Sequence, residues 1–233
     1  MDAYRPPLPG AILFDLDNTL CTFVDAKQAA CNAVAQLTGA GSGEELFSYF
    51  LRPKYNFEDH AHITDYLRDI NAYSEQLAKK AGIVYDEVKL DTIALYPGVE
   101  ETLDAIKEAG VKIAVVTDAF SSQAEERMHK LGIDSCFPVL VTPDISGQRK
   151  PGHASFILAM EQLHVTPSET WVVGDSLRRE VVPGLELGLT TVFARYGDWI
   201  QIEMPEVKPH HILDQFSDLL NLPGLSHLQI RQK

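Results

Sequence analysis

The sequence predicts an α/β protein in which a parallel sheet carries helices on both faces, together with a second part that is all helical. Two observations carry this prediction. From Gly98 onwards, short apolar runs alternate with amphipathic helical stretches, a pattern typical of right-handed strand–helix–strand units. Between residues 23 and 95, the spacing of apolar residues is helical throughout.

The first expected strand is the apolar run Ala11–Phe14, which is followed by two carboxylates, Asp15 and Asp17. An uninterrupted apolar run of this length is typical of a strand that is buried on both faces. Because alternate side chains of an extended backbone point the same way, the two carboxylates can face one small site at the end of the strand. Such a pair requires a shared proton or a metal ion, unless it merely caps a turn.

Residues 23–95 are expected to form three or four helices that pack on one another. Apolar residues recur at helical spacing over residues 26–37, over 46–50, and in a long third helix that starts at residue 63 and ends near Gly82. The segment 52–60 breaks this periodicity and is expected to be a loop.

The remaining chain supplies further strands that end in polar residues. Thr117 and Asp175 directly follow two of them, as Asp15 follows the first, so these side chains converge on one sheet edge if the three strands are neighbours. Lys150 lies in a loop that reaches the same edge. Carboxylates, a hydroxyl and an ammonium group together suit a divalent cation beside a phosphoryl group. Strands are expected over residues 111–116, 138–141, 170–173 and 190–193 and near 212–213, and helices over 99–106, 121–131 and 156–163 and after Ser176.

Composition and charge exclude several classes of partner. The formal net charge of −13 would repel a phosphate backbone, so a nucleic-acid polymer is not an expected partner. No run of 18 apolar residues exists and residues 1–10 lack the features of a signal peptide, so we expect no membrane association and a cytoplasmic location. The three cysteines lack metal-site spacing and are expected to be reduced thiols.

Taken together, these residues resemble the haloacid dehalogenase (HAD) superfamily, specifically its phosphatases with a helical cap inserted after the first motif. The resemblance implies a Rossmann-like core formed by residues 1–22 and 96–233 and a cap formed by residues 23–95. Four signatures occur in the expected order, namely Asp15-Leu-Asp17-Asn-Thr19, Thr117 after a strand, Lys150-Pro151, and Gly174-Asp175-Ser176 followed by Glu180.

The resemblance implies a catalytic role for each of several residues. Asp15 would be the nucleophile that forms an aspartyl-phosphate, and Asp17 would protonate the leaving alcohol and then activate water. Thr117 and Lys150 would hold the phosphoryl oxygens. Asp118 stands in the substrate-binding position where many relatives have asparagine.

The resemblance also implies a Mg²⁺ site. Its ligands would be Asp15, the main-chain carbonyl of Asp17, and Asp175, with Glu180 supporting the metal's water shell. Glutamate replaces the usual aspartate at this last position. Hard oxygen ligands of this kind are those that Mg²⁺ prefers.

The expected activity is therefore Mg²⁺-dependent hydrolysis of a small phosphate monoester, with phosphoglycolate-, sugar-phosphate- and nucleotide-like substrates all open. Asp17 favours a phosphate ester over an organohalide, because a leaving halide needs no proton. A phosphonatase would need a cap lysine; Lys27 and Lys54 are available, but we expect both to be solvated. The alternatives are a phosphomutase of the same superfamily and a binding or regulatory protein with weak catalysis.

Overall fold

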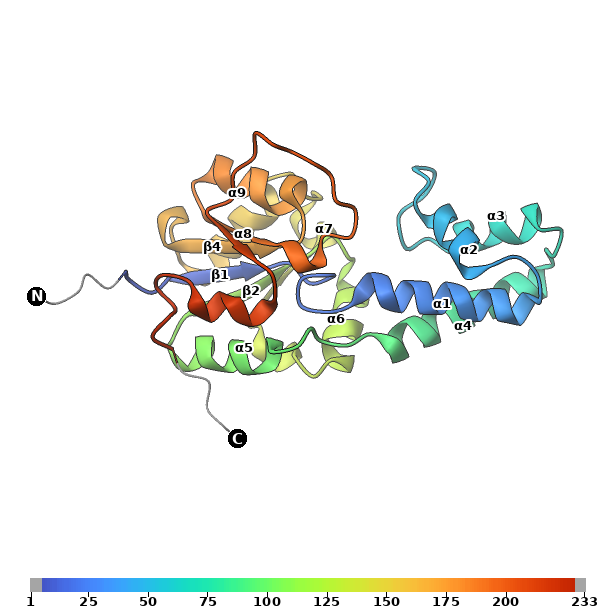
Figure 1. Ribbon diagram of the computed structural model, residues 1–233, viewed down its shortest axis with the longest axis horizontal. Coiled ribbons are helices and arrows are strands. Elements are labelled where there is room, and N and C mark those ends of the chain that lie inside the picture. Colours follow the sequence, from blue (N-terminus) through green and yellow to red (C-terminus); the bar gives the residue numbers. More distant parts are fainter. Residues whose placement is uncertain (1–5, 229–233) are drawn as a thin grey trace, which may run out of the picture. The chain divides into compact units, whose positions relative to one another are not determined.

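The computed structural model describes residues 6–228 (Figure 1). Two compact units share the chain. One consists of the residues up to Thr22 together with those from Leu95 onwards, and the other is Phe23–Ala94. Each unit is described by itself below.

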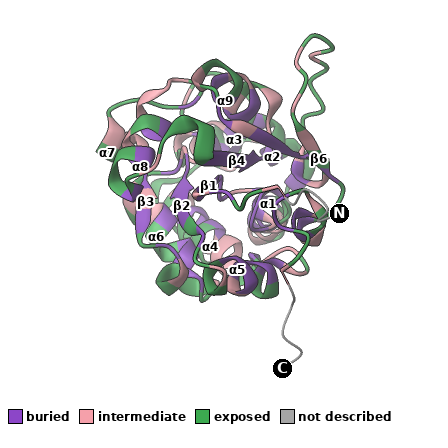
Figure 2. Ribbon diagram, turned by 90° about the vertical axis from the view of Figure 1, so that its left-hand side faces the viewer, coloured by how far each residue is buried: buried purple, intermediate pink, exposed green. Residues whose placement is uncertain are grey.

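The first unit is built on a six-stranded sheet in the order β3-β2-β1-β4-β5-β6 (Figure 2). Every pair of neighbouring strands is parallel, as the alternation of strands and helices predicts. The strands are β1 (Ala11–Phe14), β2 (Lys112–Val116), β3 (Val139–Val141), β4 (Thr170–Gly174), β5 (Thr190–Ala194) and β6 (His211–Leu213).

Helices cover both faces of this sheet, with α8 and α9 over one face and α5 and α6 over the other, which confirms the predicted α/β class (Figures 1 and 2). Phe156 and Ala159 of α8 pack with Leu13 and Val116 in the core between helix and sheet. The helices are α5 (Val99–Glu108), α6 (Ser121–Lys130), α7 (Pro143–Ser146), α8 (Ala154–Leu163), a π-helix (Leu177–Val181) and α9 (Val182–Leu187), with short 3₁₀ turns at Asp134–Cys136, Pro167–Glu169, Arg195–Gly197 and Phe216–Asn221.

The strand order decides which residues meet at the edge of the sheet. Strand β1 lies between β2 and β4, and Phe14 is in register with Val115 and Val173. Asp15, Thr117 and Asp175 therefore leave three adjacent strands at nearly the same level. This confirms that the three strands are neighbours, which is the condition on which the predicted site depends.

The second unit consists of four helices, α1 (Phe23–Thr38), α2 (Gly43–Phe50), α3 (Ala61–Asp69) and α4 (Glu75–Thr92). The prediction of one long third helix ending near Gly82 is wrong. The chain breaks at Asn71, which has a positive φ of 57°, and restarts at Ser74, whose side chain accepts a hydrogen bond from the Leu77 amide. Helix α4 then continues through Gly82 to Thr92.

Lys27 in α1 is wholly buried, so the expectation that it is solvated is wrong. Its ammonium group lies 3.8 Å from the centre of the Phe50 ring and 4.0 Å from that of Phe57, and it donates a hydrogen bond to the Phe57 carbonyl. Cation–π contact and this hydrogen bond offset the loss of hydration. Lys54, in contrast, is largely exposed and pairs with Asp65.

Within residues 6–228, the helices are all too short or too polar to cross a lipid bilayer.

Candidate active site

The first predicted site residue, Asp15, is held by Lys150 at the carboxyl end of β1. Lys150 Nζ lies 2.5 Å from Asp15 Oδ1 and 2.6 Å from Glu180 Oε1, and it donates to the Val116 carbonyl at 3.0 Å. All of these side chains are buried. Although burial itself disfavours the charged amine, the carboxylates of Asp15, Glu180 and Asp118 raise the pKa of Lys150 above its usual value. Lys150 is therefore a permanent cation in the centre of the site.

Thr19 connects the first and last motifs. Its hydroxyl donates to Asp15 Oδ2 at 3.0 Å and accepts from the main-chain amide of Asp175 at 3.1 Å. With Lys150 on Oδ1 and Thr19 on Oδ2, both oxygens of Asp15 have a fixed direction. Such a carboxylate is oriented before any substrate binds.

Asp175 and Glu180 lie on either side of the start of the π-helix (Leu177–Val181). Asp175 and Ser176 precede this helix, with Ser176 in an extended conformation, and Glu180 lies within it. The amide of Val182 bonds to the carbonyl of Leu177, a spacing of five that widens the turn. Glu180 is anchored further by the Ser176 amide, which donates to its Oε2 at 3.1 Å.

Gly174, the last residue of β4, leaves the space through which Glu180 reaches the site. A Cβ at this position would lie 2.2 Å from Cγ of Glu180. We expect Gly174→Ala to displace Glu180, to destabilise the fold by about 1–3 kcal/mol, and to lower the affinity for a divalent ion by about 10–100-fold. Metal titrations of activity and thermal melts check this.

A double-mutant cycle provides the control for this prediction. Glu180→Ala removes the Cγ and Cδ that the new methyl group would meet at 2.2 and 2.8 Å but keeps the Cβ at 2.8 Å, so adding Gly174→Ala to that variant should cost less stability than in the wild-type protein. A loss of the same size in both backgrounds would show that the methyl group disturbs something other than Glu180.

The side chain of Asp17 binds an arginine that the sequence analysis did not single out. Arg127 of α6 donates from Nη1 to Asp17 Oδ2 at 2.5 Å. The Arg127 side chain is only 4% exposed, and that of Asp17 is 19% exposed. The signal in the sequence was the position of Arg127 on the buried stripe of α6, between Ala124 and Met128, where a charge is unusual.

Thr117 and Asp118 have different surroundings at the end of β2. Thr117 is buried, and its hydroxyl accepts from the Ala119 amide at 3.1 Å. The Asp118 carboxylate accepts from the main-chain amide of Lys150 at 2.9 Å, and its carbonyl accepts from Arg149 at 2.6 Å. Asp118 thus supports the loop that carries Lys150, a role that its expected place beside the substrate did not suggest.

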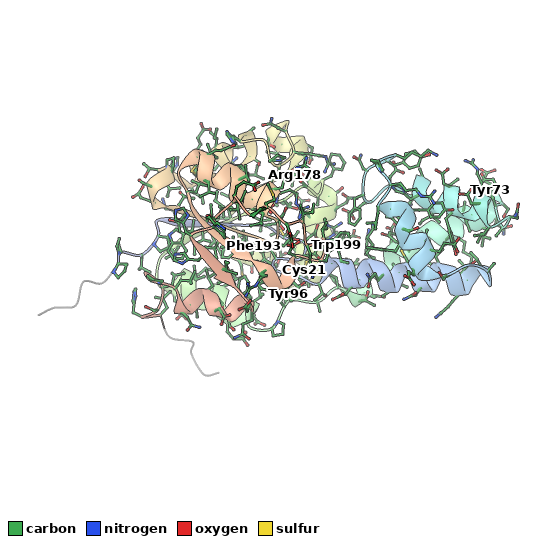
Figure 3. All side chains as sticks on the ribbon, turned by 45° about the horizontal axis from the view of Figure 1, so that its top comes forward. Cys21, Tyr73, Tyr96, Arg178, Phe193 and Trp199 are labelled. Carbon is green, nitrogen blue, oxygen red and sulfur yellow. The ribbon has the colours of Figure 1, made fainter. Side chains whose placement is uncertain are left out.

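The loop after β1 is braced from two directions. Tyr196 donates to the Thr19 carbonyl at 2.6 Å, and a Cβ on Gly197 would lie only 1.7 Å from the Asn18 carbonyl oxygen. In addition, the backbone of Cys21 pairs with that of Leu95 in an isolated antiparallel β-bridge. Figure 3 labels Cys21 and Tyr96, the residue that follows Leu95. These contacts explain why residues 195–197 matter to the site, although they carry no catalytic group.

Three of the predicted metal ligands meet. Asp15, Asp175 and Glu180 each offer a carboxylate oxygen, and these three oxygens lie within 4.8 Å of one another. Burial raises the pKa of Asp175 well above its usual value. The positive charge of Arg179, 2.8 Å from Asp175 Oδ1, lowers this pKa but does not cancel the effect of burial. Glu180 Oε1 is paired with Lys150 Nζ at 2.6 Å. An all-oxygen donor set with an excess of buried negative charge fits Mg²⁺.

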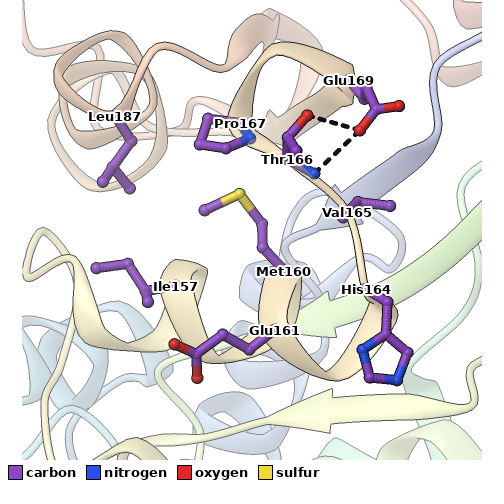
Figure 4. A pocket seen from close by; sticks show the side chains of 9 residues that line it. All are labelled: Ile157, Met160, Glu161, His164, Val165, Thr166, Pro167, Glu169 and Leu187. Carbon is purple, nitrogen blue, oxygen red and sulfur yellow. Dashed lines mark hydrogen bonds between the residues drawn. The ribbon is translucent and has the colours of Figure 1, made fainter.

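A separate cavity of about 530 Å³ lies on the same unit (Figure 4). It is bordered by Thr166 and Glu169, which precede β4 and therefore lie at the opposite end of the strand from Asp175. None of the nine described lining residues is a lysine or arginine that could hold a phosphate. These residues are Ile157, Met160, Glu161, His164, Val165, Thr166, Pro167, Glu169 and Leu187.

Comparison with known proteins agrees with this geometry. A family model described as a haloacid dehalogenase-like hydrolase matches residues 9–188. The glyceraldehyde 3-phosphate phosphatase of Methanopyrus kandleri is 30% identical over 90% of this chain and 97% of its own. The ribulose-1,5-bisphosphate 5-phosphatase of Halopiger xanaduensis is 28% identical over 78% of this chain and 83% of its own.

Among solved structures, the crystal structure of a predicted phosphoglycolate phosphatase from Haemophilus somnus 129PT superimposes with a TM-score of 0.71. It is 23% identical, and the match covers 91% of this chain and 96% of that one. At this identity the likeness supports the fold. Together with the family model, which spans most of the chain, these matches show that the protein belongs to the haloacid dehalogenase-like hydrolases.

Proposed function

We propose that this protein is a Mg²⁺-dependent phosphatase that hydrolyses a small phosphate monoester through a phosphorylated Asp15. The observation that carries the proposal is the buried ion pair between Asp15 and Lys150 at the edge where three motif-bearing strands end. The names of the relatives support the same chemistry, since both curated relatives are phosphatases of phosphorylated sugars.

In the first half-reaction, an oxygen of Asp15 attacks phosphorus and the bond from phosphorus to the alcohol oxygen breaks. Asp17 gives its proton to that oxygen as the alcohol leaves. Lys150 and the groups around Thr117 hold the phosphoryl oxygens. Because phosphoryl transfer requires mainly alignment and charge neutralisation, the fixed orientation of Asp15 contributes directly to the rate.

In the second half-reaction, Asp17 takes a proton from water, and the water oxygen attacks phosphorus. The bond between phosphorus and Asp15 breaks, so phosphate leaves and both carboxylates return to their initial states. Asp15, Asp175 and Glu180 would hold Mg²⁺, with the carbonyl of Asp17 as a further proposed ligand. When bound, the ion neutralises charge on the phosphoryl group.

For the substrate, the relatives favour a small phosphorylated sugar or triose over a nucleotide. We also propose that the helical unit, residues 23–94, is the cap that selects the alcohol. A pocket that must recognise hydroxyl groups can discriminate strongly between such alcohols, because an unmatched buried polar group is costly.

A phosphate-release panel tests the proposal. Purified protein is assayed with triose, pentose and hexose phosphates, phosphoglycolate, nucleoside monophosphates and an aryl phosphate, with Mg²⁺ and with a chelator. We expect Mg²⁺-dependent release of phosphate from at least one small sugar phosphate. Transfer to a second sugar position that requires a bisphosphate activator would instead indicate a mutase, and no turnover at all would indicate a binding protein.

Binding of Mg²⁺ should also stabilise the fold in a pH-dependent way. Burial raises the pKa of both Asp175 and Glu180. Without metal, the folded state therefore holds these protons more tightly than the unfolded state, and stability falls as pH rises through the folded-state pKa values. Mg²⁺ requires the ionised carboxylates, so its stabilising effect is present above those pKa values and is lost as pH falls through them.

We accordingly expect near-saturating Mg²⁺ to raise Tm at neutral pH by roughly 5–10 °C, equivalent to about 2.7 kcal/mol. In mildly acidic buffer the increase should be much smaller. Thermal melts with Mg²⁺ or chelator over a pH series measure this, and Na⁺ at matched ionic strength is the control. A pH-independent increase would contradict the assignment of the ion to these carboxylates.

A further inference from the structure

We propose that Arg179 competes with the divalent ion for the carboxylate of Asp175, and that this competition sets the affinity of the chain for Mg²⁺. In this role Arg179 is a counter-cation, which neutralises the acidic cluster and gives way when the ion binds. The inference rests on the proposed function, because it concerns the Mg²⁺ site of that reaction. It assigns a task to a residue that lies between two of the proposed ligands.

The contacts of Arg179 place a positive charge directly beside the proposed ligands. Its Nη2 donates to Asp175 Oδ1 at 2.8 Å, and its Nε lies 4.0 Å from Glu180 Oε1. Both carboxylates belong to the three whose oxygens lie within 4.8 Å of one another. Arg179 therefore supplies to these carboxylates part of the positive charge that a divalent ion would supply.

The local structure explains why Arg179, and not its neighbour, takes this position. Arg179 lies in the π-helix four residues after Asp175, and its main-chain amide donates to Ser176 Oγ at 3.3 Å. Its side chain reaches back to Asp175 from this anchored backbone. Arg178 is exposed and forms no ion pair with any carboxylate of residues 6–228. The chain thus carries two adjacent arginines, of which one is paired with a proposed metal ligand.

Arg179 differs from Lys150, the other cation of the site, in its access to water. The Lys150 side chain is 1% exposed and contacts both Asp15 and Glu180. The Arg179 side chain is 35% exposed, and within the described part of the chain its guanidinium donates one hydrogen bond, to Asp175. A partly exposed guanidinium regains water when it leaves its partner, whereas a wholly buried ammonium does not. Arg179 is therefore exchangeable, and Lys150 is fixed.

The balance of charge gives the competition its direction. The carboxylates of Asp15, Asp175 and Glu180 face the two cations Lys150 and Arg179. A divalent ion that joins them meets repulsion from Arg179, and this repulsion is strong because water screens charges poorly at a buried site. Removal of the guanidinium should therefore tighten Mg²⁺ binding. It should also leave Asp175 without its partner until the ion binds.

The test measures Mg²⁺ binding itself. Wild-type protein, Arg179→Met and Arg178→Met are titrated with Mg²⁺ by isothermal titration calorimetry at about pH 8.5, where fewer protons compete for the carboxylates. We expect Arg179→Met to bind Mg²⁺ tighter than wild type by roughly tenfold or more. Arg178→Met should stay within about threefold of wild type, since an exposed charge is screened by salt. Both variants remove one positive charge, so their difference isolates the ion pair.

Thermal melts provide a second readout that does not depend on activity. In chelator, Arg179→Met should melt below wild type, because Asp175 has lost its partner. Saturating Mg²⁺ should then raise its Tm by more than it raises that of wild type. Arg179→Lys keeps the charge and should retain nearly wild-type affinity. Arg179→Gln, which keeps a donor but not the charge, replaces Arg179→Met if the latter does not fold.

Wild-type or weaker Mg²⁺ affinity in Arg179→Met would overturn the inference, because Arg179 would then orient Asp175 for the ion. Equal tightening in Arg178→Met would overturn it as well, since net charge alone would account for the effect. In both cases wild-type protein still binds Mg²⁺ and the proposed function stands. Failure of wild-type protein to bind Mg²⁺ would instead reject the Mg²⁺ site of the proposed function, and the inference with it.

Discussion

Replacement of Asp15 by asparagine is expected to reduce phosphate release by roughly 10⁴-fold or more, because the amide cannot attack phosphorus. The side chain would keep its size, and although one charge of the buried ion pair is lost and Tm should fall, Lys150 would still be paired with Glu180. We therefore expect a folded protein with a normal circular-dichroism spectrum. Steady-state phosphate release from the best substrate of the panel measures the effect.

The control for this variant is Asp134→Asn, which removes an exposed carboxylate of the same unit. It should retain wild-type activity. Both variants are purified in the same way, so that a contaminating phosphatase contributes equally to each. Activity of Asp15→Asn close to that of Asp134→Asn would remove Asp15 from the nucleophile position.

Replacement of Lys150 by methionine is the second change with a large expected effect. The ammonium group lies within 2.6 Å of both Asp15 and Glu180, and all three groups are buried. Removal of one member of a buried ion pair leaves uncompensated charge, which costs about 3–5 kcal/mol. We therefore expect a large drop in Tm and, in the folded fraction, an activity loss of at least about 10²-fold.

Denaturant titrations and assays on the same samples separate the two effects of this change. Lys107→Met, at an exposed position of α5, is the matched control and should leave the stability and the activity unchanged. If Lys150→Met melted like the wild-type protein, the ion pair would not be the main stabilising feature of the site. If it kept full activity, Lys150 would not hold the phosphoryl group.

Much of the fold and the convergence of the motifs could be predicted from the sequence. Strands β1, β2 and β4 are short apolar runs that end directly at Asp15, Thr117 and Asp175, and parallel strands end at a common edge. The apolar runs predict where each strand ends, and the parallel topology predicts that these ends lie at one edge of the sheet. The structure confirms that the three strands are neighbours.

The features that escaped prediction depend on tertiary contacts. Asn71 and Ser74 interrupt a helical pattern that the apolar spacing alone continues, because a left-handed residue and a cap outweigh periodicity. Lys27 was expected to be solvated, yet aromatic rings bury it, and Arg127, which was not singled out, is buried and pairs with Asp17. Such compensation between residues distant in sequence is invisible in a local pattern.

The position of Glu180 is an intermediate case. Its distance from Asp175 along the chain was recognised, but the path of the chain between the two carboxylates was not. The π-helix over Leu177–Val181 carries Glu180, and the missing side chain of Gly174 leaves room for it. Neither feature has a simple sequence signal beyond the glycine itself.

The central claim is that phosphorus becomes bonded to Asp15 during turnover. The most direct measurement is a single turnover quenched in acid, followed by borohydride reduction, which converts an aspartyl-phosphate to homoserine, and by peptide mass spectrometry. The account predicts a mass change at residue 15 that rises and then decays within the turnover and is absent in Asp15→Asn. Phosphate release at the wild-type rate with residue 15 unmodified throughout, or modification at another carboxylate, would contradict it.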